Sequence, residues 1–204
     1  MQSKLQNKIL LATNNSGKVF ELKELLSPIG KLQLITPQEL GLNLNVEEVG
    51  KNYKENAVLK ATAFSDASGL ISLADDSGLE VQALDGSPGL YSARYSPKPN
   101  ATDADRRAYL LANLSNEARP WRAQFRCVIA LVAQGQETII SEGVCQGEIV
   151  PDERGDNGFG YDAIFYLPAV GKTMAELTDQ EKNQISHRAK AVNNALPYLE
   201  QLFI

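Results

Sequence analysis

The chain has 204 residues, of which 43% are hydrophobic and 22% charged, and its formal net charge is −5. This length fits one large domain or two closely joined lobes. A mildly acidic protein lacks the basic surface that a general nucleic-acid binder needs, so we expect no nucleic-acid partner. The charge still permits a polyanionic small molecule, provided that positive charge is gathered locally and a metal ion contributes.

Cysteine usage and the apolar runs favour a cytoplasmic protein that does not enter a membrane. Cys127 and Cys145 both lie in apolar, strand-like runs, where a thiol is typically a small buried hydrophobic group. Two cysteines and one histidine disfavour a disulfide framework and a structural zinc site. The first fifteen residues hold too short an apolar run for a signal peptide, and the sequence has no run of about 18 apolar residues.

The first elements in chain order are typical of an α/β domain. Residues 8–13 form a short apolar run, which predicts a buried strand, and a polar loop follows it. Residues 18–26 carry apolar side chains at helical spacing. Residues 32–36 predict a second strand.

The strongest helix signal covers residues 52–68. Asn52 is placed to cap its start, with Glu55 three residues later as in a capping box. Gly69 suits the C-terminal stop, because glycine adopts the left-handed conformation without strain.

The remainder of the chain predicts both strands and helices. Strand-like runs cover residues 70–74, 121–133, 137–150 and 161–166. Residues 103–114 predict a helix capped by Thr102, and residues 178–202 are largely helical, with Pro197 as a candidate break. The two long strand-like runs join at residues 134–136, which predicts a hairpin, and from its length we expect a second lobe beside a cleft.

Five segments carry residues suited to chemistry, and the first of them follows a strand and opens a helix. It consists of Thr13, Asn14, Asn15, Ser16, Gly17 and Lys18. Free backbone N–H groups and the positive end of the helix dipole make such a loop attractive to phosphate, and Lys18 adds a full charge. The segment lacks the pattern of a P-loop, which excludes a Walker motif. The alternative is an ordinary polar loop.

Two acidic segments supply candidate metal ligands. Glu47 and Glu48 precede the long helix, and Asp75 and Asp76 end a buried strand. Mg²⁺ prefers oxygen ligands, and open α/β sheets bind ligands at the carboxyl ends of their strands. Paired carboxylates repel each other unless a cation lies between them, so a metal ion is the natural relief. The alternatives are a solvated surface for the glutamates and a polar turn for the aspartates.

Lys60 lies one turn after Asn56 and beside an apolar stripe of the same predicted helix. A lysine at the edge of a core either extends its ammonium group to water or meets an anion. The sequence alone leaves both alternatives open.

The last two segments combine aromatic, acidic and basic residues. The fourth contains Gly158, Phe159, Gly160, Tyr161 and Asp162. Its glycines would let the backbone approach a flat ligand on which the ring stacks, and Asp162 would accept a hydrogen bond from a base edge. The fifth segment, at the start of the last helix, contains Lys182, Ser186, His187 and Arg188. The alternatives are a turn with a core phenylalanine and a structural histidine.

All five segments, in this order, resemble the inosine triphosphate pyrophosphatase family, including its RdgB-like bacterial members, which act on non-standard purine nucleotides. The matching stretches span residues 11–191 and read LATNNSGKVFEL, EEVGKNYKENAVLKA, LADDSGLEVQALDGSPGLYSARY, FGYDAIFY and EKNQISHRAKA. Where the family's first loop often has Thr-Gly-Asn, this chain has Thr13, Asn14 and Asn15, and asparagine tolerates positive φ.

The resemblance implies a mixed α/β fold, with a central sheet, flanking helices and two lobes around a cleft, formed as a single domain over residues 1–204. It also implies a homodimeric, Mg²⁺-dependent enzyme that converts dITP, ITP and XTP to the monophosphate and pyrophosphate.

Residue roles follow from the same resemblance. Those implied for catalysis are Asp76, Asp75, Lys18, Lys60 and Glu48, with Asp76 orienting or deprotonating the attacking water. Those implied for the metal are Glu47 and Asp76. The first segment would hold the triphosphate, and the substrate would also contact Ser77, Phe159, Gly160, Tyr161, Asp162, Lys182, His187 and Arg188.

Three alternatives remain open. One is a pyrophosphatase for other modified nucleotides, including pyrimidines, on the same scaffold. The second is a nucleotide-binding module without turnover, which would require the loss of a carboxylate. The third is an α/β domain whose polar loops only cap its strands.

Overall fold

The computed structural model describes residues 7–30 and 32–203, so part of the segment considered for a signal peptide lies outside the described residues. The chain divides into two compact units. Unit 1 comprises Met1–Asp76, Cys127–Gly143 and Arg188–Ile204, and unit 2 comprises Ser77–Arg126 and Val144–His187. The described residues form a seven-stranded mixed sheet in the order β2-β1-β3-β4-β5-β6-β7, as expected for a mixed α/β fold. Among them, no helix has the length and apolar character needed to cross a membrane.

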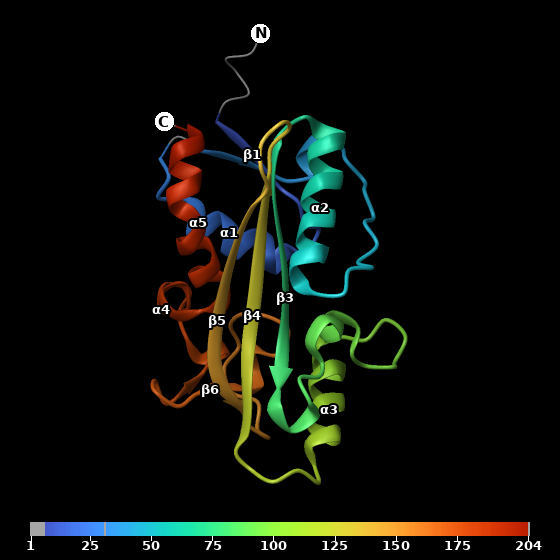
Figure 1. Ribbon diagram of the computed structural model, residues 1–204. Coiled ribbons are helices and arrows are strands. Elements are labelled where there is room, and N and C mark those ends of the chain that lie inside the picture. The colour runs from blue at the N-terminus through green and yellow to red at the C-terminus, as the bar shows by residue number, and fades with distance from the viewer. Residues whose placement is uncertain (1–6, 31, 204) are drawn as a thin grey trace. The chain divides into compact units, whose positions relative to one another are not determined.

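In unit 1, helices cover both faces of the parallel part of the sheet (Figure 1). Its elements include β1 (Lys8–Leu11), α1 (Ser16–Leu26), β2 (Gln33–Ile35), α2 (Tyr53–Ser68) and all but the first residue of α5 (His187–Phe203). β1 pairs in parallel with β2 and with β3 (Ile71–Val81). Buried residues of α1 and α5 share a core cluster with Leu73 of β3, whereas those of α2 cluster with Ala74.

β3 is longer than predicted, and this changes where its aspartates point. We expected the strand to end before Asp75 and Asp76, but it continues through both to Val81. Successive side chains of a strand point to opposite faces of its sheet. Asp75 therefore follows Leu73 toward α1 and α5, whereas Asp76 follows Ala74 toward α2.

Local capping signals set the ends of α2 as the sequence predicted. The Asn52 side chain accepts a hydrogen bond from the Glu55 N–H at 2.9 Å, and Gly69 ends the helix in the left-handed conformation at φ 70°. The expected capping box is not formed, because the Glu55 carboxylate accepts from the N–H of the residue before Asn52, at 2.7 Å. These caps fix the register in which Asn56 and Lys60, one turn apart, share a face.

Unit 2 has its own core, in which α3 (Asp103–Leu114) packs with parts of β4 (Trp121–Val132) and β5 (Ile139–Ile149). Thr102 caps α3 in a full capping box with Asp105. β4 and β5 are hydrogen-bonded neighbours joined by a short turn, which confirms the predicted hairpin. Cys127 and Cys145 are both buried, as expected. The expected cleft beside this hairpin stays a prediction.

The predicted strand over residues 161–166 is shorter in the structure. A 3-10 turn occupies Asp162–Ile164, and β6 covers Phe165–Leu167. β6 pairs antiparallel with β5 and with β7 (Lys172–Thr173). The turn, rather than a strand, therefore positions Asp162.

The C-terminal helical segment breaks at Ser186, and the expected break at Pro197 is wrong. α4 (Asp179–Ile185) ends at Ser186, which has an extended backbone conformation. The Ser186 N–H donates to the Lys182 carbonyl at 2.9 Å. α5 begins at His187 and continues through Pro197. The fifth segment thus straddles a helix end and a helix start.

Asn52→Ala tests the cap of α2. The substitution leaves the Glu55 N–H without its side-chain acceptor, so we expect the free energy of unfolding to fall by about 1 kcal/mol in denaturant titrations followed by circular dichroism. Lys54→Ala is the matched control, because Lys54 is exposed on the same helix and should change stability by less than about 0.5 kcal/mol. Equal stability of Asn52→Ala and the wild type would contradict the capping role.

Candidate active site

The loop between β1 and α1 starts the helix at Ser16, two residues earlier than predicted. The Asn15 side-chain oxygen accepts a hydrogen bond from the Lys18 N–H at 3.0 Å, and Thr13 Oγ1 accepts from the Asn15 N–H at 3.2 Å. The Lys18 side chain reaches β3, where its Nζ lies 3.0 Å from Asp75 Oδ2. The loop residues exposed to solvent are Asn14, Asn15 and Ser16.

Asp75 is fully buried and lies against two cations. Its Oδ2 accepts hydrogen bonds from Arg188 Nη2 at 2.9 Å and Nε at 3.2 Å, in addition to the Lys18 contact. Burial alone would raise the pKa of Asp75, but the charges of Lys18 and Arg188 outweigh burial and hold that pKa well below its usual range. Asp75 is therefore ionised at neutral pH.

Arg188 has different surroundings from those expected of a residue that contacts substrate. It is 1% exposed, and its Nη1 pairs with Glu21 of α1 while Nη2 and Nε bind Asp75. Burial would lower the pKa of Arg188, but these two carboxylates raise it above its usual range. Sequence reasoning missed Glu21; its signal is an acidic residue three positions after Lys18, within the apolar spacing of α1.

Asp76 lies on the opposite face of β3, beside α2. Asn56 Nδ2 donates a hydrogen bond to Asp76 Oδ2 at 3.0 Å, and Lys60 Nζ lies 3.6 Å from Oδ1. Burial raises the pKa of Asp76 and the nearby Glu48 adds to the rise, against the opposing charges of Lys60 and Lys18. A carboxylate with a raised pKa is a better proton acceptor than an ordinary aspartate.

Lys60 meets carboxylates rather than water, which decides between the two alternatives left by the sequence. Its Nζ lies 2.6 Å from Glu48 Oε1, and the lysine side chain is 13% exposed. Burial would lower the pKa of Lys60, but the charges of Asp76, Asp75 and Glu48 outweigh burial and raise it. Lys60 is therefore a cation at neutral pH.

Asn56 connects Asp76 to the acidic segment that precedes α2. Its Oδ1 accepts a hydrogen bond from the Gly50 N–H at 2.8 Å, and a Cβ at Gly50 would lie 2.6 Å from that oxygen. Glu48 of this segment is half-buried against Lys60, whereas Glu47 is exposed. Sequence reasoning did not assign Asn56 a role, although its position one turn before Lys60 was the available signal.

The unit 1 cluster fits a phosphate ligand and a shared divalent cation. Lys18 and Lys60 each act on both aspartates, so the two lysines and Asp76 belong to one site. Within residues 7–30 and 32–203, no group of three or more acidic, cysteine or histidine side chains is arranged to hold a metal alone. Mg²⁺ is commonly bound by one or two carboxylates together with substrate phosphates. Glu48 and Asp76, oxygen donors that converge on Lys60, fit that requirement.

A second cluster of predicted residues lies in unit 2. Lys182 Nζ donates to Asp162 Oδ2 at 2.6 Å, and the same oxygen accepts from the Phe159 N–H at 3.0 Å. The Lys182 ammonium lies over the Phe159 ring, 5.3 Å from its centroid. A Cβ at Gly158 would lie 2.1 Å from Asp162 Oδ2, so this glycine makes room for a buried ion pair. The expected role of the glycines toward a ligand stays a prediction.

Three further predicted residues of unit 2 have separate surroundings. His187 is 5% exposed, and its ring stacks on Phe125 with centroids 4.7 Å apart. Tyr161 is buried and donates from its hydroxyl to the Ser92 carbonyl at 2.9 Å. Ser77 is half-buried on β3.

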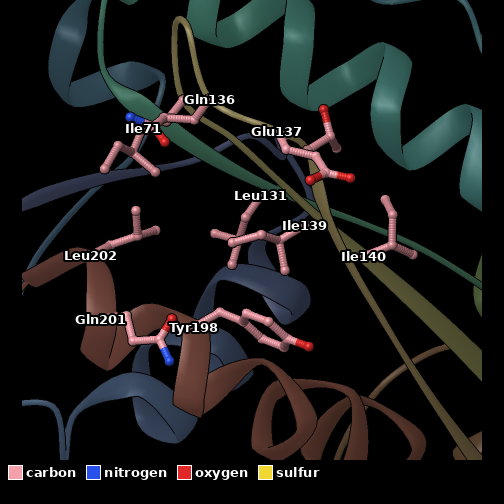
Figure 2. Close-up of a pocket in the computed structure, with 11 residues that line it drawn as sticks. Ile71, Leu131, Gln136, Glu137, Ile139, Ile140, Tyr198, Gln201 and Leu202 are labelled. Atoms are coloured by element: carbon pink, nitrogen blue, oxygen red, sulfur yellow. The ribbon is translucent and has the colours of Figure 1, made fainter.

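A cavity of about 600 Å³ lies in unit 1, away from the predicted residues. Figure 2 shows that its walls carry both aliphatic and polar side chains, among them Ile71, Leu131, Ile139, Gln136 and Glu137. None of the predicted site residues lines this cavity, so we assign it no role in the chemistry.

The parallel strands β1, β2 and β3, and the two lysines that contact the aspartates of β3, define a class of protein. Comparison with known proteins identifies that class. The chain belongs to the Ham1 family, whose sequence model matches residues 9–198. It is similar to proteins named dITP/XTP pyrophosphatase from Desulforamulus reducens, at 46% identity over 97% of this chain and 98% of that one, and from Haemophilus influenzae, at 47% over 93% and 97%.

Solved structures of the same family resemble this fold. The Staphylococcus aureus Ham1 protein is 43% identical, with a TM-score of 0.83 over 95% of this chain and 98% of that one. A HAM1 protein from Coxiella burnetii is 42% identical, with a TM-score of 0.84 over the same shares.

Arg188→Met tests the buried charge network of unit 1. The variant leaves Asp75 and Glu21 without their guanidinium partner, so we expect the free energy of unfolding at pH 7 to fall by about 3 kcal/mol. Because the pKa values of these carboxylates rise in the folded variant, folding takes up protons, and the deficit should shrink as pH falls from 7 to 5. Denaturant titrations at both pH values measure this. Arg122→Met, at an exposed position, is the control, and a deficit that grows at pH 5 would contradict the account.

Proposed function

We propose that this protein is a nucleoside triphosphate pyrophosphatase that converts dITP, ITP and XTP to the monophosphate and pyrophosphate, and so removes deaminated purines from the nucleotide pool. The observation that carries the proposal is the convergence of Lys18 and Lys60 on Asp75 and Asp76. Polyphosphate hydrolysis needs cations that bind phosphate beside carboxylates that hold a metal and a water. The names of the relatives mention dITP and XTP, which supports these two substrates.

The triphosphate is proposed to lie on the start of α1. Asn14, Asn15 and Ser16 are exposed where the loop opens α1, and the start of a helix suits phosphate oxygens. Lys18 and Lys60 add positive charge from the two faces of β3. The net charge of the protein is negative, so these lysines supply the local positive charge that attracts the phosphates.

Mg²⁺ is the proposed cofactor, held by Asp76 and by the acidic segment before α2, where the family resemblance implies Glu47 and the shared contact with Lys60 favours Glu48. When bound, the ion would neutralise phosphate charge and lower the pKa of a water. Burial, with the nearby Glu48, raises the pKa of Asp76 despite the charges of Lys60 and Lys18, so a further cation beside this carboxylate would stabilise its charged form.

Asp76 is proposed to accept the proton of the attacking water. The water oxygen bonds to the α-phosphorus, the bond from that phosphorus to the pyrophosphate oxygen breaks, and pyrophosphate leaves. Lys18 and Lys60 stabilise the negative charge that grows on the leaving group. Asp75, kept ionised by Arg188, would hold Lys18 in place. We therefore propose Arg188 as a positioning residue.

The nucleoside is proposed to contact the unit 2 cluster, with Phe159 stacking on the base. Hypoxanthine and xanthine present a 6-oxo acceptor and an N1–H donor, whereas adenine presents the reverse pattern. A donor from His187, Lys182 or the backbone at the oxo group, with Asp162 as acceptor for N1–H, would leave adenine with unpaired polar groups. Tyr161, Gly160 and Ser77 complete the proposed contacts.

Two parts of the proposal rest on the family resemblance and on composition. The first is assembly as a homodimer. The second is a cytoplasmic location, supported by two cysteines that are buried and not joined in a disulfide.

A substrate panel tests the proposal directly. With Mg²⁺ present, we expect dITP, ITP and XTP to yield pyrophosphate rather than orthophosphate, at kcat/KM at least about a hundredfold above dATP. Parallel assays of the two products with dGTP and dTTP separate this activity from a pyrophosphatase for other modified nucleotides. Preferential turnover of dTTP, or release of orthophosphate alone, would contradict the proposal.

Asp76→Asn tests the assigned base. The amide cannot take up the water's proton, so kcat for dITP should fall at least about a hundredfold, with a smaller change in KM. Steady-state kinetics measure this, and Asp66→Asn, which changes an exposed carboxylate of α2, is the control. A kcat of Asp76→Asn within threefold of the wild type would remove Asp76 from the chemistry.

A further inference from the structure

The fourth segment is held by α3 through both backbone polar groups of Gly160. The Gly160 N–H donates to Asp103 Oδ2 at 2.7 Å, and the Gly160 carbonyl accepts from Arg107 Nη1 at 2.8 Å. Asp103 and Arg107 lie four residues apart on α3 and therefore share one face of the helix. Two side chains on one turn of α3 thus bind the N–H and the carbonyl of a single loop residue, an arrangement that we call the grip on Gly160.

Arg107 is itself fixed in place. Its Nε and Nη2 donate to the two carboxylate oxygens of Glu153, each at 2.8 Å, while Nη1 remains on Gly160. The side chain is 15% exposed, and the hydrogen bonds to Glu153 raise the pKa of Arg107. A forked guanidinium bound at all three nitrogens has little freedom to rotate away.

Asp103 is not needed to cap α3, because the capping box uses Thr102 and Asp105. Burial would raise the pKa of Asp103, but the hydrogen bond from the Gly160 N–H and the contacts with Arg106 outweigh it and lower that pKa. Its carboxylate is therefore a charged acceptor, which makes the bond to Gly160 stronger than one between neutral groups.

The two hydrogen bonds act at a residue that packing does not hold, although the next residue, Tyr161, is anchored by the bond from its hydroxyl to the Ser92 carbonyl. Gly160 has φ 62°, and a Cβ there would meet no atom within 4 Å, so packing does not hold the residue. The flanking residues form a turn in which the Asp162 N–H donates to the Phe159 carbonyl at 3.2 Å. Gly160 lies between Phe159 and Asp162 in this turn, so its orientation affects where the Phe159 ring and the Asp162 carboxylate lie.

We propose that Asp103 and Arg107 are positioning residues that hold the base-binding turn in its substrate-ready conformation by gripping Gly160. The inference rests on the proposed function only in assigning Phe159 and Asp162 to the base. Loosening the turn would weaken binding of the ground state and the transition state alike, because the reacting phosphate is assigned to unit 1. Such a change raises KM and leaves kcat nearly unchanged.

Arg107→Met and Asp103→Ala test this role. For the nucleotide that the wild type hydrolyses fastest, we expect KM to rise about tenfold and kcat to stay within about threefold of the wild type. Amide exchange of Gly160, followed by NMR without nucleotide, should speed up at least about tenfold in Asp103→Ala. Arg107→Lys, which keeps the positive charge and an ammonium donor group, should recover part of the loss in KM. Lys98→Met is the control, because it removes an exposed lysine paired with Asp105.

The outcomes separate this inference from the proposed function. Wild-type activity toward dITP decides the function, whereas the ratio of variant to wild type decides the positioning role. Thermal unfolding identifies a variant that fails to fold, and Arg107→Lys then carries the kinetic test. KM values within twofold of the wild type, or unchanged exchange of Gly160, would overturn the positioning role. A fall in kcat at constant KM would also overturn it.

Discussion

The unit 1 site depends on the way one strand separates two neighbouring carboxylates. Asp75 and Asp76 are adjacent in sequence, yet the pleat of β3 sends them to opposite faces of the sheet. Each then meets its own lysine, Lys18 or Lys60, so the repulsion expected between paired aspartates is relieved by separate cations. Burial would raise the pKa of both aspartates; the charges of Lys18 and Arg188 outweigh burial at Asp75, whereas burial outweighs the lysines at Asp76. The dipeptide thereby supplies an ionised carboxylate that holds Lys18, which is Asp75, and a candidate proton acceptor, which is Asp76.

Unit 2 reaches a defined geometry by a different route. In its turn, charged partners and backbone hydrogen bonds act beside the packing of the buried Tyr161. The buried Asp162–Lys182 pair is oriented by the Phe159 N–H, and α3 holds Gly160. A buried ion pair adds little net stability compared with an apolar pair. A conformation that leaves either charge buried without its partner is costly in free energy. Such pairs therefore favour one arrangement of a loop over its competitors.

The sequence predicted best what local signals control. Asn52 marked the start of α2, because a cap is set by residues within one turn. It failed where partners are distant in the chain: Arg188 finds Asp75 across 113 residues, and no local pattern announces that pairing. Pro197 was expected to break the last helix, yet the break came at Ser186. The candidate residues were found by type and order, whereas their partners required the tertiary structure.

Gly158 shows how a recognisable motif can persist for reasons unrelated to catalysis. Its missing side chain leaves the space that Asp162 occupies, and its φ of 76° would strain any other residue. Replacing this glycine would disturb the fold of the turn before any nucleotide arrived. A homologous chain without catalytic activity would therefore still need the same residues for the turn to fold. The Gly-Phe-Gly-Tyr-Asp signature consequently diagnoses a shape, and assigning an activity to a chain that bears it demands inspection of the aspartates on β3.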